Sequence, residues 1–216
     1  MDIERLIADH PYLYHMAEKD SWPSIQQFGL WSTSALLDHH HITGQARFQH
    51  ESQHRPEKTI LHSPHFATTV LRDQKPMNDS RLHVALKDGL TPRNWYEILN
   101  SKTFFWVSLD RLLTLLNARA YRNEEHDVLK LRSEPLIRAY RERILLCHMN
   151  SGNTFPMPHA RGRGTFAPIE NFPVASNGRP LKPVVELVVE YGVPDIAQYV
   201  ISVDRMRGGD VLATLA

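Results

Sequence analysis

Short apolar runs alternate with amphipathic segments along the chain, and this pattern predicts an α+β fold. The run over residues 183–189, read PVVELVV, is rich in β-branched residues and predicts a buried strand. A second apolar run over residues 198–203 predicts another strand after the break at Gly192 and Pro194. Because no repeat or interdomain linker is visible, we expect residues 1–216 to form one domain with a split, mixed sheet and peripheral helices.

Other elements follow from the same periodicities and from capping residues. Ser34 is expected to cap a helix that begins at Ala35, and Thr91 with Pro92 to open a helix that Asn100 ends. Residues 150–183 are rich in Pro, Gly, Asn and Ser and predict a long irregular loop, which in a domain of this size usually has a function. Further strands are expected over residues 12–16, 81–86, 103–107, 128–131 and 143–147, and further helices over residues 3–8, 22–28, 109–116 and 133–140.

Composition changes this picture little. The net charge of +1 over 216 residues excludes an overall electrostatic attraction to nucleic acid or membrane, although local patches are still possible. The N-terminus lacks a signal-peptide core and no apolar run approaches a membrane span, so we expect a soluble, cytoplasmic protein. The single cysteine, Cys147, rules out an internal disulfide, and its apolar surroundings predict a buried structural thiol.

Histidines are frequent, 13 in all, and several fall between residues 38 and 65. His50 and His54 would share one face of a helix, whereas adjacent histidines such as His39 and His40 point in different directions. No Cys joins them and no HExxH spacing occurs, so we expect a solvated helix and loop and no metal site. A metal-dependent hydrolase that uses the histidines of residues 39–65 remains an alternative.

Glu186 is the main candidate for chemistry, because a carboxylate inside an apolar strand is costly to bury unless it has a partner or a task. Two other interpretations remain open. Glu186 can lie on the solvent face of an edge strand, and Glu190, on the same face of that strand, can take its role.

Four motifs follow one another along the chain: LYHM from Leu13, WPSI from Trp22 with FGL and STS from Phe28 and Ser32, TFFW from Thr103, and VE at Val185. In this order they resemble the ADP-ribosyltransferase superfold and especially its branch with a His-Tyr-Glu signature. The opening motifs are similar to those of DarT-type toxins, which modify DNA, and of tRNA 2′-phosphotransferases. The resemblance covers both ends and the middle of the chain, and we expect an uncharacterised bacterial family of that fold.

The resemblance implies that NAD is the substrate and lies between His15, Phe104 and Glu186. His15 would donate a hydrogen bond to the ribose beside the nicotinamide, with Met16 near the carboxamide. Phe104 stands where relatives have the signature Tyr, so it keeps the ring that stacks on nicotinamide but lacks the hydroxyl. Glu186 takes the catalytic position. From the residues alone, His15 and Phe104 can equally be core side chains.

Further residues are assigned to the NAD site by the same resemblance. The superfold places its target-recognition loop before the Glu strand, which corresponds to residues 150–183 here. Arg161 and Arg163 in this loop can clamp a phosphate of NAD or of a nucleic acid, or simply be solvated. The remaining side chains expected to line the cleft are Ser32, Thr33, Ser34 and Phe105.

The expected reaction is transfer of ADP-ribose from NAD to a macromolecular acceptor, a nucleic acid or a protein, with release of nicotinamide. A carboxylate stabilises the oxocarbenium-like state that forms when the nicotinamide–ribose bond breaks, and it can also deprotonate the nucleophile. One alternative is a non-catalytic nucleotide- or partner-binding module, which loss of the signature Tyr favours. Another is an RNA 2′-phosphotransferase, which would need Arg or Lys side chains clustered around the cleft.

Overall fold

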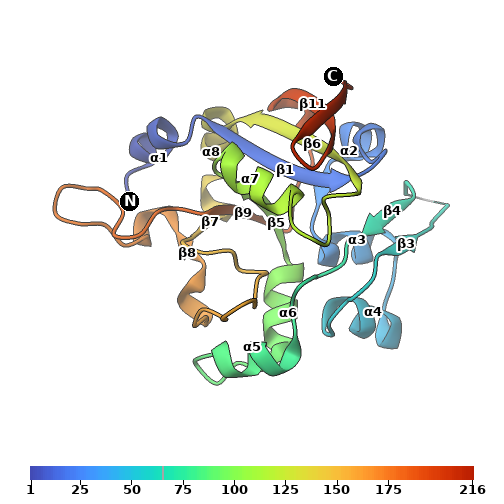
Figure 1. Cartoon of the computed structure of the whole chain (residues 1–216), viewed down its shortest axis with the longest axis horizontal. Helices are drawn as coiled ribbons and strands as arrows, with labels where there is room; N and C mark the ends of the chain where they lie inside the picture. The colour runs from blue at the N-terminus through green and yellow to red at the C-terminus, as the bar shows by residue number, and fades with distance from the viewer. Residues whose placement is uncertain (65) are drawn as a thin grey trace.

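An eight-stranded sheet forms the centre of the computed structural model, which describes residues 1–64 and 66–216 (Figure 1). Each pair of neighbouring strands in it is antiparallel. Two small sheets pair β2 (Leu30–Trp31) with β10 (Gly192–Val193) and β3 (Thr59–Leu61) with β4 (Thr69–Leu71). The order of strands in the large sheet is β12 (Asp210–Thr214), β11 (Val200–Arg207), β6 (Glu125–Arg132), β1 (Tyr12–Glu18), β5 (Lys102–Trp106), β9 (Glu186–Glu190), β7 (Ile144–Cys147) and β8 (Ala167–Pro168).

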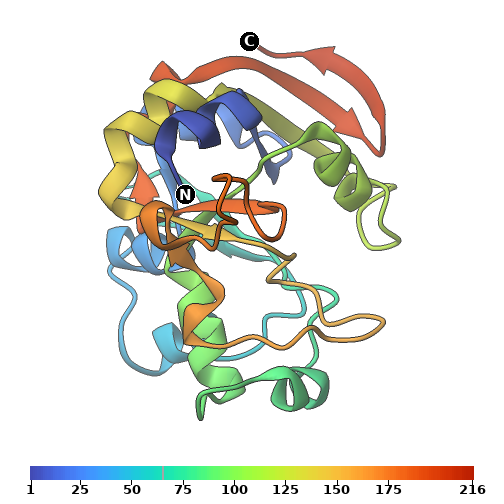
Figure 2. The ribbon, with the colours of Figure 1, turned by 90° about the vertical axis from the view of Figure 1, so that its left-hand side faces the viewer.

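Helices surround this sheet, and α5 and α6 extend below it in both views (Figures 1 and 2). The α+β class with peripheral helices is therefore confirmed. The α-helices are α1 (Ile3–Asp9), α2 (Trp22–Phe28), α3 (Thr33–His39), α4 (Gly44–Glu51), α5 (Asp79–Ala85), α6 (Pro92–Asn100), α7 (Leu109–Leu116) and α8 (Ser133–Tyr140). The short 3-10 helices are η1 (Arg141–Arg143), η2 (Arg163–Thr165), η3 (Ile169–Asn171) and η4 (Ile196–Gln198).

Capping residues explain where several helices begin. Thr91 accepts a hydrogen bond from the backbone N–H of Asn94, whose side chain in turn accepts from the N–H of Thr91, so α6 begins with a full capping box. α3 is capped by Ser32, whose Oγ accepts from the N–H of Ala35. The prediction that Ser34 caps this helix is wrong, because the helix begins at Thr33 and Ser34 lies within its first turn.

The large sheet is split between β1 and β5. These two strands share a single register pair, Tyr14 with Trp106, whereas β1 pairs with β6 over its whole length. The sequence predicts a split and mixed sheet. The split is present, but every pair of neighbouring strands in the large sheet is antiparallel, so this sheet is not mixed. Beyond the single pair the two halves of the sheet separate, which leaves room beside His15.

β9 lies in the interior of the sheet, between β5 and β7. Leu187 and Val189 pack into the largest hydrophobic cluster, while Val188 on the opposite face packs into a second cluster with Trp95 and Phe166. The apolar run therefore supplies both faces of a strand that is buried from Glu186 to Val189, as its sequence predicts.

One predicted strand is a helix. Residues 79–85 form α5, in which Leu82 and Ala85 are buried at helical spacing and Val84 is exposed. Asn78 caps this helix by accepting from the N–H of Arg81. The alternation of Leu82 and Val84 suggested a strand, but the N-cap and the packing on α6 determine the local structure.

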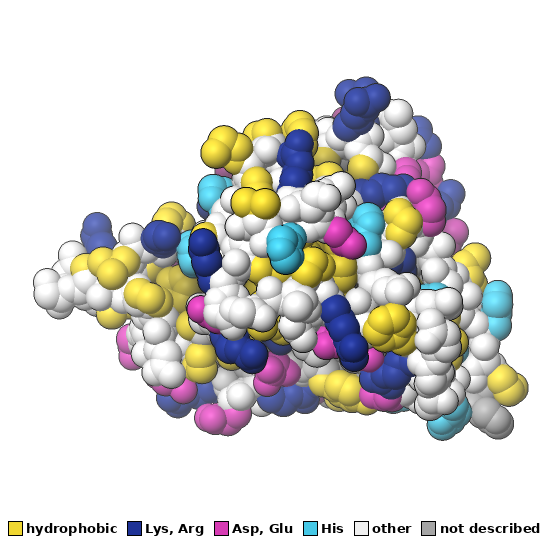
Figure 3. Space-filling model, turned by 90° about the horizontal axis from the view of Figure 1, so that it is seen from below, with side chains coloured by type: hydrophobic (Ala, Val, Ile, Leu, Met, Phe, Trp, Pro, Cys, Tyr) yellow, Lys and Arg dark blue, Asp and Glu magenta, His cyan; other side chains and the backbone are white. Residues whose placement is uncertain are grey.

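Residues 150–183 hold only short elements, η2, β8 and η3, as the composition predicts. Their last part forms a narrow hairpin in which Leu181 donates to the carbonyl of Pro173 and Ala175 to that of Arg179. The hairpin projects on the left in Figures 1 and 3. Seen from below, Lys and Arg side chains are interspersed with Asp and Glu (Figure 3), in keeping with the small net charge. In the described part of the chain, no helix is long and apolar enough to span a bilayer.

Candidate functional site

A cavity of about 1230 Å³ lies where β1 and β5 separate, and it is larger than a typical small-molecule site. Its wall includes the end of β1, the start of α3, β5, α7 and the loop after β7. Seven of the ten site residues predicted from the sequence line it, and Ser34, Arg161 and Arg163 do not. The seven are His15, Met16, Ser32, Thr33, Phe104, Phe105 and Glu186.

Glu186 is the first residue of β9, pairs with Trp106 on one side and Cys147 on the other, and is only 3% exposed. It is therefore not on an edge strand. Its Oε1 accepts a hydrogen bond of 3.1 Å from the backbone N–H of Ser151. Its Oε2 is buried and has no hydrogen-bond partner among the described residues, and Glu186 is part of the cavity wall.

Burial raises the pKa of Glu186 to about 7, although Ser151, through its backbone N–H and its nearby hydroxyl, and the charges of Arg161 and Arg111 oppose this rise. A carboxyl group with a pKa near neutrality can both give and take a proton under ordinary conditions. Glu190 lies in a different environment, since its side chain is 52% exposed and lies 3.9 Å from the ammonium of Lys102. The geometry favours Glu186 over Glu190 as the acid of the cavity.

His15 crosses the split in the sheet. Its Nδ1 lies 2.8 Å from the carbonyl oxygen of Phe104, and because a carbonyl can only accept, Nδ1 carries the proton. Burial lowers the pKa of His15 to about 4, helped by the charge of Arg72 and opposed by the bond to Phe104. The neutral ring therefore offers Nε2 as an acceptor. The predicted role as donor to a ribose is wrong, since the ring has only one N–H and β5 uses it.

Phe104 and Phe105 lie on opposite faces of β5. Phe104 is half-buried and lines the cavity, and its ring meets that of Phe166 edge-on, with centroids 6.2 Å apart. Phe105 is almost fully buried in the main core and lies 5.8 Å from the ring of His15. Phe104 thus offers a ring to a ligand, whereas Phe105 mainly supports His15 from behind.

The serine and threonine residues at the start of α3 differ in their access to the cavity. Ser32 and Thr33 line it, and Thr33 Oγ1 accepts a long hydrogen bond of 3.4 Å from Arg55. Ser34 is buried away from the cavity wall, so its predicted place in the site is wrong. Met16 lines the cavity, and its carbonyl accepts from Arg72 at 2.9 Å.

Arg161 and Arg163 are not at the cavity. Arg161 is 1% exposed and its guanidinium donates to the carbonyls of Ser151, Asn153 and His159 at 2.6, 2.7 and 3.0 Å. Arg163 is exposed beside Asp88, to which its backbone N–H donates. The prediction that this pair clamps a phosphate in the cleft is wrong. The guanidinium of Arg161 forms hydrogen bonds with carbonyls of its own loop, and Arg163 does not line the cavity.

Cations that the sequence did not single out line the cavity instead. The lining contains six Lys and Arg side chains but only three acidic ones, Glu18, Asp73 and Glu186. It therefore carries an excess of positive charge, although the net charge of the chain is only +1. They come from segments far apart in the sequence, so no basic run reveals them. The six are Arg55, Arg72, Lys75, Lys102, Arg111 and Arg119.

Several polar atoms of the lining lack a protein partner. Besides Glu186 Oε2, buried atoms without a partner in the described part of the chain include Thr103 Oγ1 and Ser151 Oγ, whereas Glu18 Oε2 and Arg72 Nε make no hydrogen bond but form an ion pair of 3.9 Å with each other. Buried polar groups are almost always satisfied by protein, water or ligand. The combination of orphan polar atoms, cations and aromatic rings suits a polar, anionic ligand with an aromatic part.

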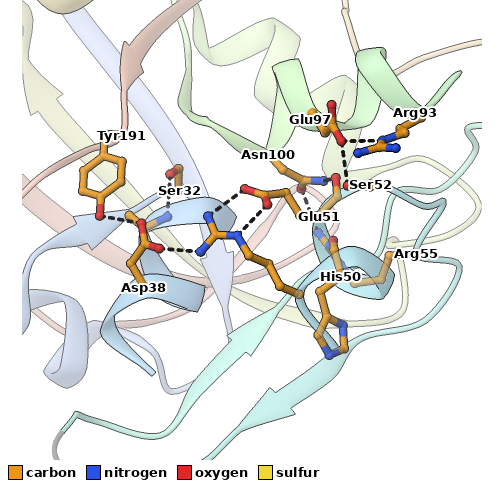
Figure 4. Close-up of polar contacts among 12 residues, drawn as sticks. Ser32, Asp38, His50, Glu51, Ser52, Arg55, Arg93, Glu97, Asn100 and Tyr191 are labelled. Carbon is orange, nitrogen blue, oxygen red and sulfur yellow. Dashed lines mark hydrogen bonds and ion pairs between the residues drawn. The ribbon is translucent and has the colours of Figure 1, made fainter. Parts of the chain in front are cut away.

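A network of polar contacts joins α3, α4 and α6 beside the cavity (Figure 4). Tyr191 donates to Asp38 at 2.8 Å, Asp38 pairs with Arg47, and Arg47 pairs with Glu51 at 2.7 Å. The side chain of Asn100 then donates to the carbonyl of Glu51 at 2.8 Å. Individual exposed ion pairs contribute little, but this chain of contacts joins three helices and orients the residues that face the cavity.

Arg55 lies within the same wall. It is buried, donates to the carbonyl of Arg72 at 2.7 Å and to Asn100 Oδ1 at 3.3 Å, and has no carboxylate within ion-pair distance among the residues described. Burial lowers the pKa of Arg55 to about 10, so it remains charged at neutral pH. A buried, unpaired cation at a cavity wall favours an anionic ligand.

Two other predictions concern residues outside the cavity. Cys147 is fully buried, and burial, together with the nearby Glu186, raises the pKa of its thiol to about 12, which fits a structural thiol. Among the histidines of residues 39–64, His39 and His40 both contact the ring of Phe66, and His40 Nε2 lies 2.9 Å from Thr69 Oγ1. Within residues 1–64 and 66–216 no three His, Cys, Asp or Glu side chains are placed to hold a metal ion; His65 lies outside the described residues.

Comparison of the chain with curated proteins and with solved structures gives no significant match. A family model described as "Family of unknown function (DUF7002)" matches residues 11–200, a stretch that contains β1, β5, β9 and the whole lining of the cavity. The chain belongs to this family.

Proposed function

We propose that the protein cleaves the nicotinamide–ribose bond of NAD and transfers ADP-ribose to a macromolecular acceptor. The observation that carries the proposal is the meeting of three groups at one cavity: the half-bonded carboxylate of Glu186, the neutral imidazole of His15 and the ring of Phe104. They lie on three neighbouring strands, in the order β1, β5 and β9.

Each group has a chemical role in this reaction. The ring of Phe104 can stack on nicotinamide and hold the leaving group face-on. His15 Nε2 can accept a hydrogen bond from a ribose hydroxyl and so fix the sugar. Glu186 Oε2 can stabilise the positive charge that develops on the ribose and then take the proton of the nucleophile.

The cationic lining supports a dinucleotide as the ligand. Arg111 and Arg119 have no ion-pair partner in the described residues, and both line the cavity from α7 and the turn that follows it. A pyrophosphate would neutralise such side chains, and guanidinium groups bind phosphate oxygens with two hydrogen bonds. The volume of about 1230 Å³ leaves room for the acceptor group beside the dinucleotide.

The direct test is the release of nicotinamide from NAD labelled in the nicotinamide ring. We expect Glu186→Gln to lower the rate at least about 100-fold, because it removes the charge that stabilises the transition state. Glu190→Gln, on the same strand but exposed, is the matched control and should keep the rate within about twofold. Label placed in the adenine half then identifies whether nucleic acid, protein or water receives the ADP-ribose. Equal rates for wild type and Glu186→Gln would contradict the proposal.

A second candidate is the RNA 2′-phosphotransferase activity, which the six cations of the cavity lining favour. In that reaction, the cavity would bind an RNA 2′-phosphate together with NAD. An oligoribonucleotide with an internal 2′-phosphate separates the two candidates. Loss of its phosphate only when NAD is present would favour the phosphotransferase, and nicotinamide release without such an RNA favours ADP-ribose transfer. Binding of NAD without any release would point to a non-catalytic module, consistent with the missing hydroxyl at Phe104.

A further inference from the structure

A buried arginine and a buried glutamate hold the two sides of one residue, Ser151. The backbone N–H of Ser151 donates to Glu186 Oε1 at 3.1 Å, and its carbonyl accepts from Arg161 Nη1 at 2.6 Å. Both charged side chains are almost fully buried, 3% exposed for Glu186 and 1% for Arg161. One residue of an otherwise irregular loop thus connects the acid of the cavity to a buried cation.

Arg161 is itself firmly anchored. Its backbone forms a bridge with α5, donating to the carbonyl of Ala85 and accepting from the N–H of Lys87, each at 2.9 Å. Its guanidinium lies over the ring of Trp95 at 5.7 Å. The remaining hydrogen bonds end on the carbonyls of Asn153 and His159. The position of Ser151 is therefore set by α5 and α6 through Arg161, although Ser151 itself lies in a loop.

Ordinary ion pairing does not explain why this arginine is buried. No carboxylate of the described residues lies within ion-pair distance of its guanidinium, and a buried cation without a partner is costly. The charged or titratable groups that face Glu186 are Arg161 from the loop, Arg111 from α7 and Cys147 from β7. Arg161 is the one of the three that also shares a hydrogen-bonded residue with Glu186.

We propose that Arg161 is a positioning residue for Glu186: by fixing the carbonyl of Ser151, it keeps the N–H of that residue on Oε1 and leaves Oε2 free for the substrate. This inference rests on the proposed function only for the identity of the substrate. Burial favours the protonated form of Glu186, and the positive charge of Arg161 opposes this by favouring the ionised form. Arg161 therefore acts without touching the substrate, at a place where the sequence suggested a phosphate clamp.

Two substitutions separate the geometric from the electrostatic effect. Arg161→Lys keeps the charge but cannot hold three carbonyls at once, so we expect kcat for nicotinamide release to fall about 100-fold with KM for NAD nearly unchanged. Arg161→Met also removes the charge, so the acidic limb of its pH–rate profile should move to higher pH. Arg179→Met, in the exposed hairpin of the same loop, is the matched control and should change neither quantity.

A second readout does not depend on activity. The carboxyl carbon of Glu186, assigned by its loss in Glu186→Gln, is followed by NMR during a pH titration of the ¹³C-labelled protein without NAD. We expect it to titrate at higher pH in Arg161→Met and at the wild-type pH in Arg161→Lys. If Arg161→Met does not fold, Arg161→Lys carries the test through its kcat.

The outcomes distinguish this inference from the proposed function. Wild-type kcat in Arg161→Lys, or a Glu186 carboxyl in Arg161→Met that titrates as in wild type, would overturn the positioning role. A loss of activity that arises only from a higher KM would do the same. If the wild type releases no nicotinamide, the proposed function fails, while the NMR titration still decides whether Arg161 controls Glu186.

Discussion

At the scale of single residues, the cost of Glu186 is the clearest sign of function. A carboxyl whose pKa is raised to about 7 in the folded protein, from an ordinary value near 4.5, is more easily ionised in the unfolded chain. The folded state therefore holds the proton more tightly, and this group lowers the free energy of unfolding as the pH rises from about 4.5 to 7. A side chain that weakens the fold at neutral pH is expected to have a chemical task.

The stability of Glu186→Gln tests this cost. The variant should be more stable than wild type at pH 8, by roughly 3 kcal/mol, since about 1.4 kcal/mol corresponds to each unit between the two pKa values. At pH 5 the gain should nearly vanish, because the carboxyl is protonated in the folded wild type. Urea unfolding of both proteins at the two pH values measures the difference. The depressed pKa of His15 affects both proteins equally and cancels in this comparison.

The opposite dependence, with a gain that is larger at pH 5 than at pH 8, would mean that the folded protein stabilises the ionised form of Glu186 and lowers its pKa.

The ring of Phe104 gives a second prediction at this scale. Phe104→Leu keeps most of the volume but removes the stacking surface, so we expect NAD to bind about tenfold more weakly. Phe104→Tyr should bind NAD within about threefold of wild type, because the ring that stacks on nicotinamide is kept. Calorimetric titration with NAD, in the Glu186→Gln background to prevent turnover, measures both. Equal affinities of the Leu and Tyr variants would place nicotinamide away from Phe104.

At the scale of elements, the site depends on the split between β1 and β5. A continuous ladder would place backbone hydrogen bonds where the ring of His15 now donates to the carbonyl of Phe104. The start of α3 reaches the cavity through the short pairing of β2 with β10, which brings Ser32 and Thr33 to the wall. Close approach of backbones makes this arrangement possible, notably at Gly29, where α2 ends against Pro194.

Gly29→Ala is expected to disrupt that approach. Gly29 has a φ of +92°, and an added Cβ would lie 2.6 Å from the Cα of Pro194, which cannot move without shifting the backbone. Gly44 also has a positive φ, +62°, but an added Cβ there meets nothing within 4 Å. We expect Gly29→Ala to cost at least about 2 kcal/mol more than Gly44→Ala in urea unfolding. A similar cost at both positions would show that backbone conformation alone accounts for the effect.

Local signals predicted these elements unevenly. The capping box at Thr91 and the β-branched run around Glu186 agree with their surroundings, so α6 and β9 are where the sequence places them. Residues 81–86 carry an alternating pattern that also fits a helix with one buried side, and only the cap at Asn78 distinguishes the two. Ser151 forms hydrogen bonds with Glu186 and Arg161, which lie far from it or in an irregular loop, where no regular sequence spacing indicates a contact. The role of Arg161 beside Glu186 could therefore not be predicted from the sequence.

At the scale of the whole molecule, the fold concentrates positive charge that composition conceals. The chain has a net charge of +1, yet the cavity lining has twice as many cationic side chains as acidic ones. Arg55, Arg72 and Arg119 come from separate segments, and their convergence follows from the topology of the sheet. His15, Phe104 and Glu186 could be named from the sequence because the motifs that contain them occur in the same order as in the family they resemble. The cations around them follow no local sequence pattern.

Removal of one such cation gives the prediction at this scale. Arg119→Met should weaken binding of NAD about tenfold and reduce its dependence on salt, because a charged hydrogen bond to phosphate contributes roughly 1.5–3 kcal/mol. Arg119 is exposed at the cavity rim, so the fold should be unaffected. Arg179→Met removes the same charge from the distant hairpin and serves as the control. Loss of affinity in both variants alike would indicate a general effect of net charge.

The central claim is that one cavity brings His15, Phe104 and Glu186 to the same NAD molecule. A crystal structure of Glu186→Gln with intact NAD tests it most directly. We predict the nicotinamide ring against Phe104, a ribose hydroxyl within hydrogen-bond distance of His15 Nε2 and the amide of residue 186 beside the bond that breaks. NAD bound elsewhere, or bound here with its nicotinamide end away from β5 and β9, would contradict the account.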